Sequence, residues 1–147
     1  METVYDPQAF FRIGTRDPSI SLPGLIRRLR PPTGPIDVVL DTDTFNEVDD
    51  QFALSYLLKQ GDRLRVKALY AAPFHNEKST GPADGMEKSY REILTLLSLL
   101  GREDVKPLVY KGSPRYLPSE GEPVPSPAAE HLARLAPAYT PEQPLYV

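Results

Sequence analysis

The stretch that decides the fold is residues 36–60, which read IDVVLDTDTFNEVDDQFALSYLLKQ. Its first five residues are mostly apolar and rich in β-branched side chains, which is typical of a strand buried on both faces. From residue 50 to residue 60, apolar side chains recur at helical spacing. The residues expected to form this apolar face are Phe52, Ala53, Tyr56 and Leu57. A strand followed closely by a helix predicts one unit of an α/β fold.

The same alternation continues through the rest of the chain. Further strands are expected at residues 64–72, 105–110 and 145–147, and further helices at residues 86–100 and 126–135. The first of these helices is Leu-rich and should end at Gly101, and Ser126 followed by Pro127 is typical of a helix start. The β-α-β-α-β-α-β order predicts an α/β fold with an open, mostly parallel sheet and helices on both faces.

The chain is expected to consist of an N-terminal extension, residues 1–35, and one α/β domain, residues 36–147. The extension has at most one short helix, around residues 25–29, because Pro31 and Pro32 disfavour a helical conformation just before them. The final residues, PLYV, stop inside an apolar strand. We therefore expect the domain to be the N-terminal part of a longer one, incomplete at its C-terminus, with its open sheet edge covered in a homo-oligomer or by a separate chain.

Composition limits the partners. The 147 residues include 17 Lys and Arg against 20 Asp and Glu, a formal net charge of -3, and no Cys. This balance argues against nucleic acid as a partner, because affinity for nucleic acid depends on clustered basic side chains. The N-terminus lacks the basic and apolar regions of a secretory signal, and no apolar run is long enough to span a membrane. We expect a cytoplasmic protein with no membrane partner.

Five carboxylates lie within ten residues at the junction of the first strand and the first helix. They are Asp41, Asp43, Glu47, Asp49 and Asp50. Two carboxylates about 4 Å apart repel by about 4 kcal/mol at an effective dielectric constant of about 20, so converging carboxylates must take up protons, separate or bind a cation. Ligands of open α/β sheets bind at this edge, and a site made only of oxygen ligands favours Ca²⁺ or Mg²⁺.

The same residues also fit a purely structural role. Asp49 and Asp50 would then stabilise the helix dipole, and residues 41–46 would form a solvated turn. Three features favour a cation site instead. The acidic run follows a buried strand, two more acids open the next helix, and no basic residue lies between Asp37 and Lys59 to neutralise them.

Spacing separates this segment from two known kinds of metal-binding loop. A Ca²⁺-binding helix-loop-helix site counted from Asp41 requires Gly at its sixth position and Glu at its twelfth, where this chain has Asn46 and Phe52. Mg²⁺-dependent phosphohydrolases that form an aspartyl-phosphate also place D-x-D after a strand, but they need Thr or Val where this chain has Phe45. A Mg²⁺ phosphohydrolase is therefore the second hypothesis, and a non-catalytic domain that acts through oligomer contacts is the third.

The segment resembles the inosine-uridine preferring nucleoside hydrolase family, whose hallmark is an apolar strand, D-x-D, a short loop and D-D-x-x-A-[LI]. This chain has DTD at residues 41–43 and DDQFAL at residues 49–54. The family also places an Asn after the second strand, where this chain has Asn76. The resemblance extends over residues 36–147 and is to the N-terminal half of the family's domain.

The resemblance implies a bound Ca²⁺ and hydrolysis of the N-glycosidic bond of a purine or pyrimidine ribonucleoside to ribose and a free base. It implies that Asp43 is a Ca²⁺ ligand and the catalytic base, and that Asp50 is a second ligand. Asp49 would bind a ribose hydroxyl, Asn76 would help to hold the ribose or the carboxylates, and Asp41 would orient neighbouring groups. These residue types suit the chemistry, because a carboxylate accepts a proton from water and negative charge stabilises an oxocarbenium-like sugar.

Departures from the family pattern indicate a divergent, bacterial-type subgroup. The loop TFNEV at residues 44–48 is two residues longer than is usual, so loop shape and substrate choice are expected to differ. The family's distal half supplies another Asp ligand, a main-chain carbonyl ligand and often a His that protonates the leaving base, and none of these maps onto this chain. We therefore expect the 147 residues alone to bind Ca²⁺ weakly and to release no detectable ribose.

Aromatic and His side chains near the expected site have less specific roles. His75 adjoins Asn76 and is expected to be packed or solvated rather than to protonate a leaving base. Phe45 and Tyr90 are expected to pack in the core or in a lid rather than to stack on a nucleobase. His131 lies within a predicted helix and is expected to be structural.

Overall fold

The computed structural model describes residues 21–119 and 121–147 of the chain. The chain divides into two compact units, Met1–Thr33 and Gly34–Val147. The expected site residues all belong to the second unit.

The first unit contains one described helix, α2 (Leu22–Arg28). It begins after Ser21, whose side chain caps the helix by accepting a hydrogen bond from the Gly24 amide at 3.3 Å. The helix expected around residues 25–29 therefore starts three residues earlier. It stops before Pro31, as the restriction on residues that precede proline requires.

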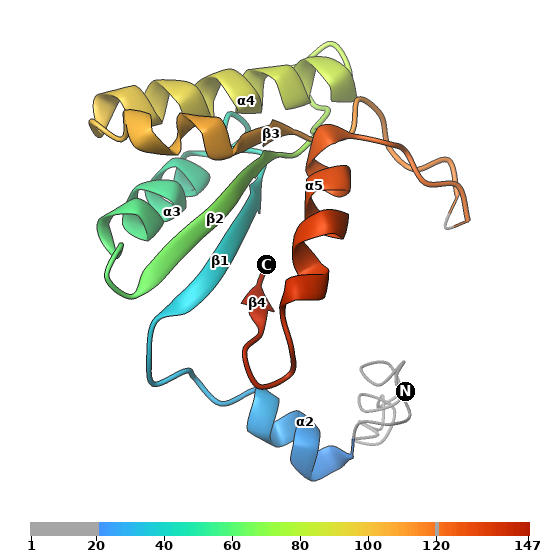
Figure 1. The fold of residues 1–147 in the computed structure, drawn as a ribbon. Coiled ribbons are helices and arrows are strands. Elements are labelled where there is room, and N and C mark those ends of the chain that lie inside the picture. Colours follow the sequence, from blue (N-terminus) through green and yellow to red (C-terminus); the bar gives the residue numbers. More distant parts are fainter. Residues whose placement is uncertain (1–20, 120) are drawn as a thin grey trace, which may run out of the picture. The chain divides into compact units, whose positions relative to one another are not determined.

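The second unit is built on a four-stranded, all-parallel sheet with strand order β3-β2-β1-β4 (Figure 1). The strands are β1 (Ile36–Thr42), β2 (Leu64–Ala71), β3 (Val109–Lys111) and β4 (Leu145–Tyr146). The helices are α3 (Val48–Lys59), α4 (Pro82–Leu99) and α5 (Pro127–Leu135), with 3₁₀ helices η1 (Glu103–Leu108) and η2 (Ala136–Ala138). The predicted α/β fold with a parallel sheet is confirmed.

Helices cover both faces of the sheet, because successive side chains of a strand point to opposite faces. One core joins β2 to α3 and α4 and includes Leu54, Leu69, Ala71, Ile93 and Leu97. The other core joins β1 and β2 to α5 and consists of Val39, Ala68, Tyr70 and Ala128. In Figure 1, α3 and α4 lie on one side of the strands and α5 lies on the other.

The strand order reverses beside β1. From β1, the chain adds β2 and then β3 on one side, and β4 then pairs with the other side of β1. β1 pairs with β2 from Ile36 opposite Leu64 to Thr42 opposite Ala71. Ligands of open α/β sheets bind at such a reversal, outside the carboxyl ends of the strands. The acidic loop after β1 therefore starts at the edge where a ligand is expected.

The first helix of this unit is confirmed, and Leu57 of its expected apolar face is buried, but the other three residues of that face are exposed. Phe52 is 71% exposed, Tyr56 is 64% exposed, and Ala53 is exposed as well. The residues that α3 buries are Leu54, Leu57 and Leu58. The expected set and the buried set both have helical spacing, so periodicity alone does not decide which face of α3 is buried. Packing against β2 and α4 selects the leucines.

The third strand is shorter than expected. The sequence pattern predicts a strand over residues 105–110, but residues 105–108 belong to the 3₁₀ helix η1, and β3 is limited to Val109–Lys111. Pro107 lies inside η1 and has no N–H to donate to a neighbouring strand. This missing donor explains why the apolar run begins as a helical turn.

The longest described helix, α4, starts four residues before the expected position. Pro82 lies in its first turn, after Gly81, where Pro is favoured because the N–H that it lacks would have no partner there. The helix ends as predicted before Gly101, whose φ of 67° is the left-handed conformation that glycine adopts readily. Within residues 21–119 and 121–147, neither α4 nor any other helix has the length and apolar character needed to cross a bilayer.

Candidate functional site

The site lies where β1 and β2 end side by side. The Ala72 amide donates a hydrogen bond to the Thr42 carbonyl at 2.8 Å, so the two strands stay paired up to their last residues. The loop after β1 has the acidic residues, and the loop after β2 has Asn76. The parallel sheet therefore brings together two segments that are about thirty residues apart in the sequence.

Buried threonine side chains attach the first turn of α3 to the end of β1. The Thr42 hydroxyl donates to an oxygen of Asp50 at 2.5 Å, and Thr42 and Thr44 hydroxyls lie 3.1 Å apart. Thr42 is 4% exposed and Thr44 is fully buried. A charge-assisted hydrogen bond of this kind fixes the direction of the Asp50 carboxylate.

Asp43 and Asn76 are connected through Asn46. The Asn46 backbone amide donates to the Asp43 carbonyl at 2.6 Å, and its side-chain amide donates to the Asp43 carboxylate at 2.9 Å. The Asn76 side-chain amide then donates to the Asn46 side-chain oxygen at 2.6 Å. Sequence reasoning gave no role to Asn46. The feature that could have indicated Asn46 is its place in the longer loop, three residues after the D-x-D motif.

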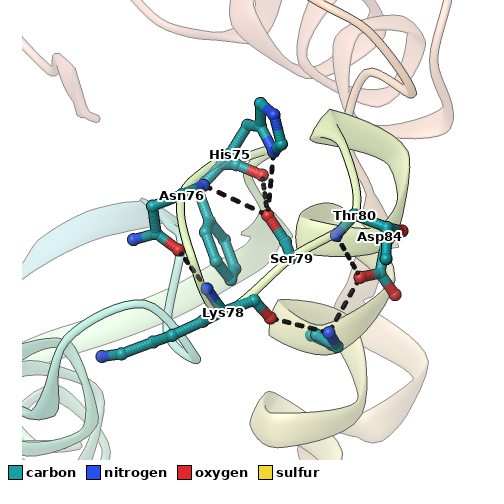
Figure 2. A network of polar contacts seen from close by, with 8 residues as sticks. His75, Asn76, Lys78, Ser79, Thr80 and Asp84 are labelled. Atoms are coloured by element: carbon teal, nitrogen blue, oxygen red, sulfur yellow. Dashed lines mark hydrogen bonds and ion pairs between the residues drawn. The ribbon is translucent and has the colours of Figure 1, made fainter.

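The turn after β2 fixes the Asn76 side chain, as Figure 2 shows. The Asn76 side-chain oxygen accepts a hydrogen bond from the Lys78 amide at 2.9 Å. The Ser79 hydroxyl donates to the Phe74 carbonyl at 3.2 Å and accepts from the Asn76 amide at 3.3 Å. With its oxygen held inside the turn, the Asn76 side chain presents its N–H₂ group to the loop after β1.

A basic side chain reaches the acidic loop from this same turn. The Lys78 ammonium group donates to the Asn46 carbonyl at 2.5 Å. The Lys88 ammonium group lies 6.0 Å from the centre of the Phe45 ring. The sequence between Asp37 and Lys59 contains no basic residue, but the fold brings Lys78 to this loop. The net negative charge around the loop is therefore smaller than its own sequence implies.

Asp41 lies on a different face from Asp50. The Asp41 side chain lies on the same face of β1 as Val39, which packs on α5. Thr42, which bonds to Asp50 of α3, points to the opposite face, because neighbouring strand residues alternate. Partial burial, and then the neighbouring Asp43 charge, raise the pKa of the Asp41 carboxyl group. The negative charge of Asp43 thus acts on Asp41 through space, and within the described chain no hydrogen bond joins the two side chains.

The remaining predicted residues are accessible to solvent to different degrees. Asp49 is exposed in the first turn of α3. His75 is exposed, with its ring nitrogen 3.4 Å from the Ser79 hydroxyl. Phe45 stacks on Phe74 with ring centres 6.5 Å apart, which is the packing role expected for it. His131 stacks on Tyr110 and shares a 2.8 Å hydrogen bond with Tyr70, so it has the structural role expected.

The donor chemistry of the site suits a hard cation, but the set of donors is partial. Asp43 and Asp50 offer carboxylate oxygens, the ligands that Ca²⁺ prefers. Among the residues that the structure describes, no three Asp, Glu or His side chains converge into a metal-binding group. Ca²⁺ takes about six to eight oxygen ligands, so two carboxylates supply only part of a coordination shell. Binding of Ca²⁺ by this chain, and its expected weakness, both stay predictions.

Asp43, Asn46 and Asn76 thus form one hydrogen-bonded set. Thr42 holds Asp50 separately. Asp41 and Asp49 belong to neither group. This arrangement offers a carboxylate that can accept a proton and amide groups that can hold hydroxyls. Comparison of the chain with protein-family models, with curated proteins and with solved structures found no match.

Proposed function

We propose that this chain provides the carboxylate and amide groups of a site that hydrolyses the N-glycosidic bond of ribonucleosides. The observation that supports the proposal most is the hydrogen-bonded set that joins Asp43 to Asn76 through Asn46. These are the positions that the family resemblance assigns to catalysis and to ribose binding. With part of a ligand set in the chain, the 147 residues would be a weakly active or inactive form.

In this proposal Asp43 is the catalytic base. It accepts a proton from water, and the water oxygen forms a bond to C1′ of the ribose. The N-glycosidic bond breaks, its electron pair goes to the leaving nucleobase, and the nucleobase takes up a proton from solvent. Asp49 and Asn76 hold ribose hydroxyls, and the negative charge of the loop stabilises the positive charge that develops on the sugar. Ca²⁺, when bound, would be held by Asp43 and Asp50 and would make a nearby water more acidic.

The first prediction concerns Asp43. Asp43→Asn removes the charged ligand and the proton acceptor, so we expect Ca²⁺ affinity to fall by roughly ten-fold or more, since a charged contact is worth about 1.5–3 kcal/mol. The measurement is a titration with millimolar Ca²⁺ followed by NMR, with Asp62→Asn in the exposed turn after α3 as the matched control. A ribonucleoside panel with and without chelator measures ribose release in parallel.

Two results would contradict the proposal. Release of phosphate from phosphomonoesters with Mg²⁺, and none of ribose, would favour the phosphohydrolase hypothesis. Absence of Ca²⁺ binding at millimolar concentration would leave only a scaffold role. Strong ribose release by the chain alone would instead overturn the expectation that it is weakly active.

One observation favours a second function, which is contact with another chain. Val48, Phe52 and Tyr56 are spaced four residues apart on α3 and are each at least 64% exposed. Residues four apart share a helix face, so these side chains form one apolar stripe. Exposed apolar patches are typical of surfaces that bind other proteins.

A further inference from the structure

A second candidate binding site lies on the α5 side of the sheet. A cavity of about 320 Å³ is bounded by the ends of β1 and β2, the segment 112–117 and the first two turns of α5. Its lining includes Asp41, Tyr70, Arg115, Tyr116, Ser126 and Leu132. Small-molecule pockets have volumes of roughly 300–1,000 Å³, so this cavity accommodates a molecule of one or two rings.

The cavity combines apolar walls with two charged groups of opposite sign. Both groups line the cavity, and within the described ranges neither the Asp41 carboxylate nor the Arg115 guanidinium group makes a hydrogen bond or ion pair with another residue. The Tyr70 hydroxyl is already engaged with His131, and the Ser126 hydroxyl already caps α5. Asp41 and Arg115 are therefore the charged side chains available to a ligand, one as acceptor and one as donor, beside the hydroxyl groups of Ser113 and Tyr116.

These features restrict the chemistry of the ligand. The cavity has one acidic and one basic side chain, so a ligand without net charge brings no excess charge beside either of them. Aromatic and aliphatic walls, with Tyr70, Tyr116 and Leu132, favour a flat ring. We propose that this cavity binds a small, neutral, planar nitrogen heterocycle that presents an N–H donor to Asp41 and an acceptor to Arg115.

This site is independent of the proposed hydrolysis. It uses Asp41 on the α5 face of β1, and it requires neither Ca²⁺ nor the set formed by Asp43, Asn46 and Asn76. A test in the presence of chelator therefore separates the two proposals, because failure of one leaves the other standing.

The test is an NMR titration of the chain with 2-aminopyrimidine and with pyrimidine, which has the same ring without the amino donor. We expect 2-aminopyrimidine to bind about ten-fold more tightly than pyrimidine, because only it donates a hydrogen bond to a carboxylate. The shifted signals should include Tyr70 and Leu132. In Asp41→Ala, the affinity for 2-aminopyrimidine should fall to that for pyrimidine.

A second pair of variants tests the place of binding without touching a charge. Ala129 lines the cavity and is exposed, so Ala129→Leu fills the space without disturbing a core, and it should abolish binding of both probes. Ala133→Leu adds the same volume at an exposed position of α5 outside the cavity and should leave both affinities unchanged. Equal affinity of the two probes, or binding that survives Asp41→Ala and Ala129→Leu, would overturn the proposal.

Discussion

At the scale of single residues, Gly85 is a position where the fold leaves no room for a side chain. A Cβ at Gly85 would lie 2.0 Å from the Phe74 carbonyl oxygen, because the first turn of α4 packs directly on the backbone of the turn that contains Asn76. In a helix, Ala is favoured over Gly by about 1 kcal/mol. The clash is with backbone rather than with a flexible side chain, so it outweighs that gain.

We therefore predict that Gly85→Ala lowers the free energy of unfolding by about 1–3 kcal/mol, the usual cost of overpacking. Urea denaturation measures this change. Gly34→Ala is the matched control, because a Cβ there has no atom within 4 Å. Equal stability of Gly85→Ala and the control would mean that the turn at Asn76 is free to move.

At the scale of elements, α3 has one leucine face in the core and one apolar stripe in solvent. Leu54 is fully buried, whereas Phe52 is 71% exposed. We predict that Leu54→Ala lowers stability by about 2–5 kcal/mol, because it leaves a cavity in the core. Phe52→Ala should change stability by less than about 0.5 kcal/mol.

The comparison of these two variants, again by urea denaturation, tests which face of α3 packs on the sheet. A large loss of stability in Phe52→Ala and a small one in Leu54→Ala would show that the helix is rotated. Analytical ultracentrifugation of Phe52→Ala tests separately whether the stripe contacts another chain.

At the scale of the whole molecule, one buried and one partly buried phenol make stability depend on alkaline pH. Burial raises the pKa of Tyr70 to about 12, with smaller contributions from Tyr110 and Asp41, and burial and Asp37 raise the pKa of Tyr139 to about 12. In the unfolded chain a phenol ionises near pH ~10. Unfolding therefore releases protons in this window, and stability should decline as pH rises from about 10 to about 12.

We predict that Tyr70→Phe makes this decline less steep, because one of the two protons is no longer released. The measurement is the free energy of unfolding as a function of pH. Tyr56→Phe is the matched control, because the Tyr56 side chain is 64% exposed and its environment changes little on unfolding. An unchanged slope in Tyr70→Phe would contradict the assignment.

The sequence by itself determined the order of strands and helices, the parallel sheet and the position of Asp43 and Asp50 near the carboxyl end of β1. These features follow from hydrophobic periodicity and from proline and glycine positions, which act over a few residues. Even locally the information was incomplete, since two faces of α3 had helical spacing and Pro107 shortened β3.

Only the tertiary structure decided which groups meet. Asn46 joins Asp43 to Asn76, and Lys78 reaches the acidic loop, because β1 and β2 end side by side. Asp41, two residues from Asp43, faces α5 and lines the cavity beside it. Such contacts join residues about thirty positions apart and depend on which sheet face each side chain takes, so no local pattern specifies them.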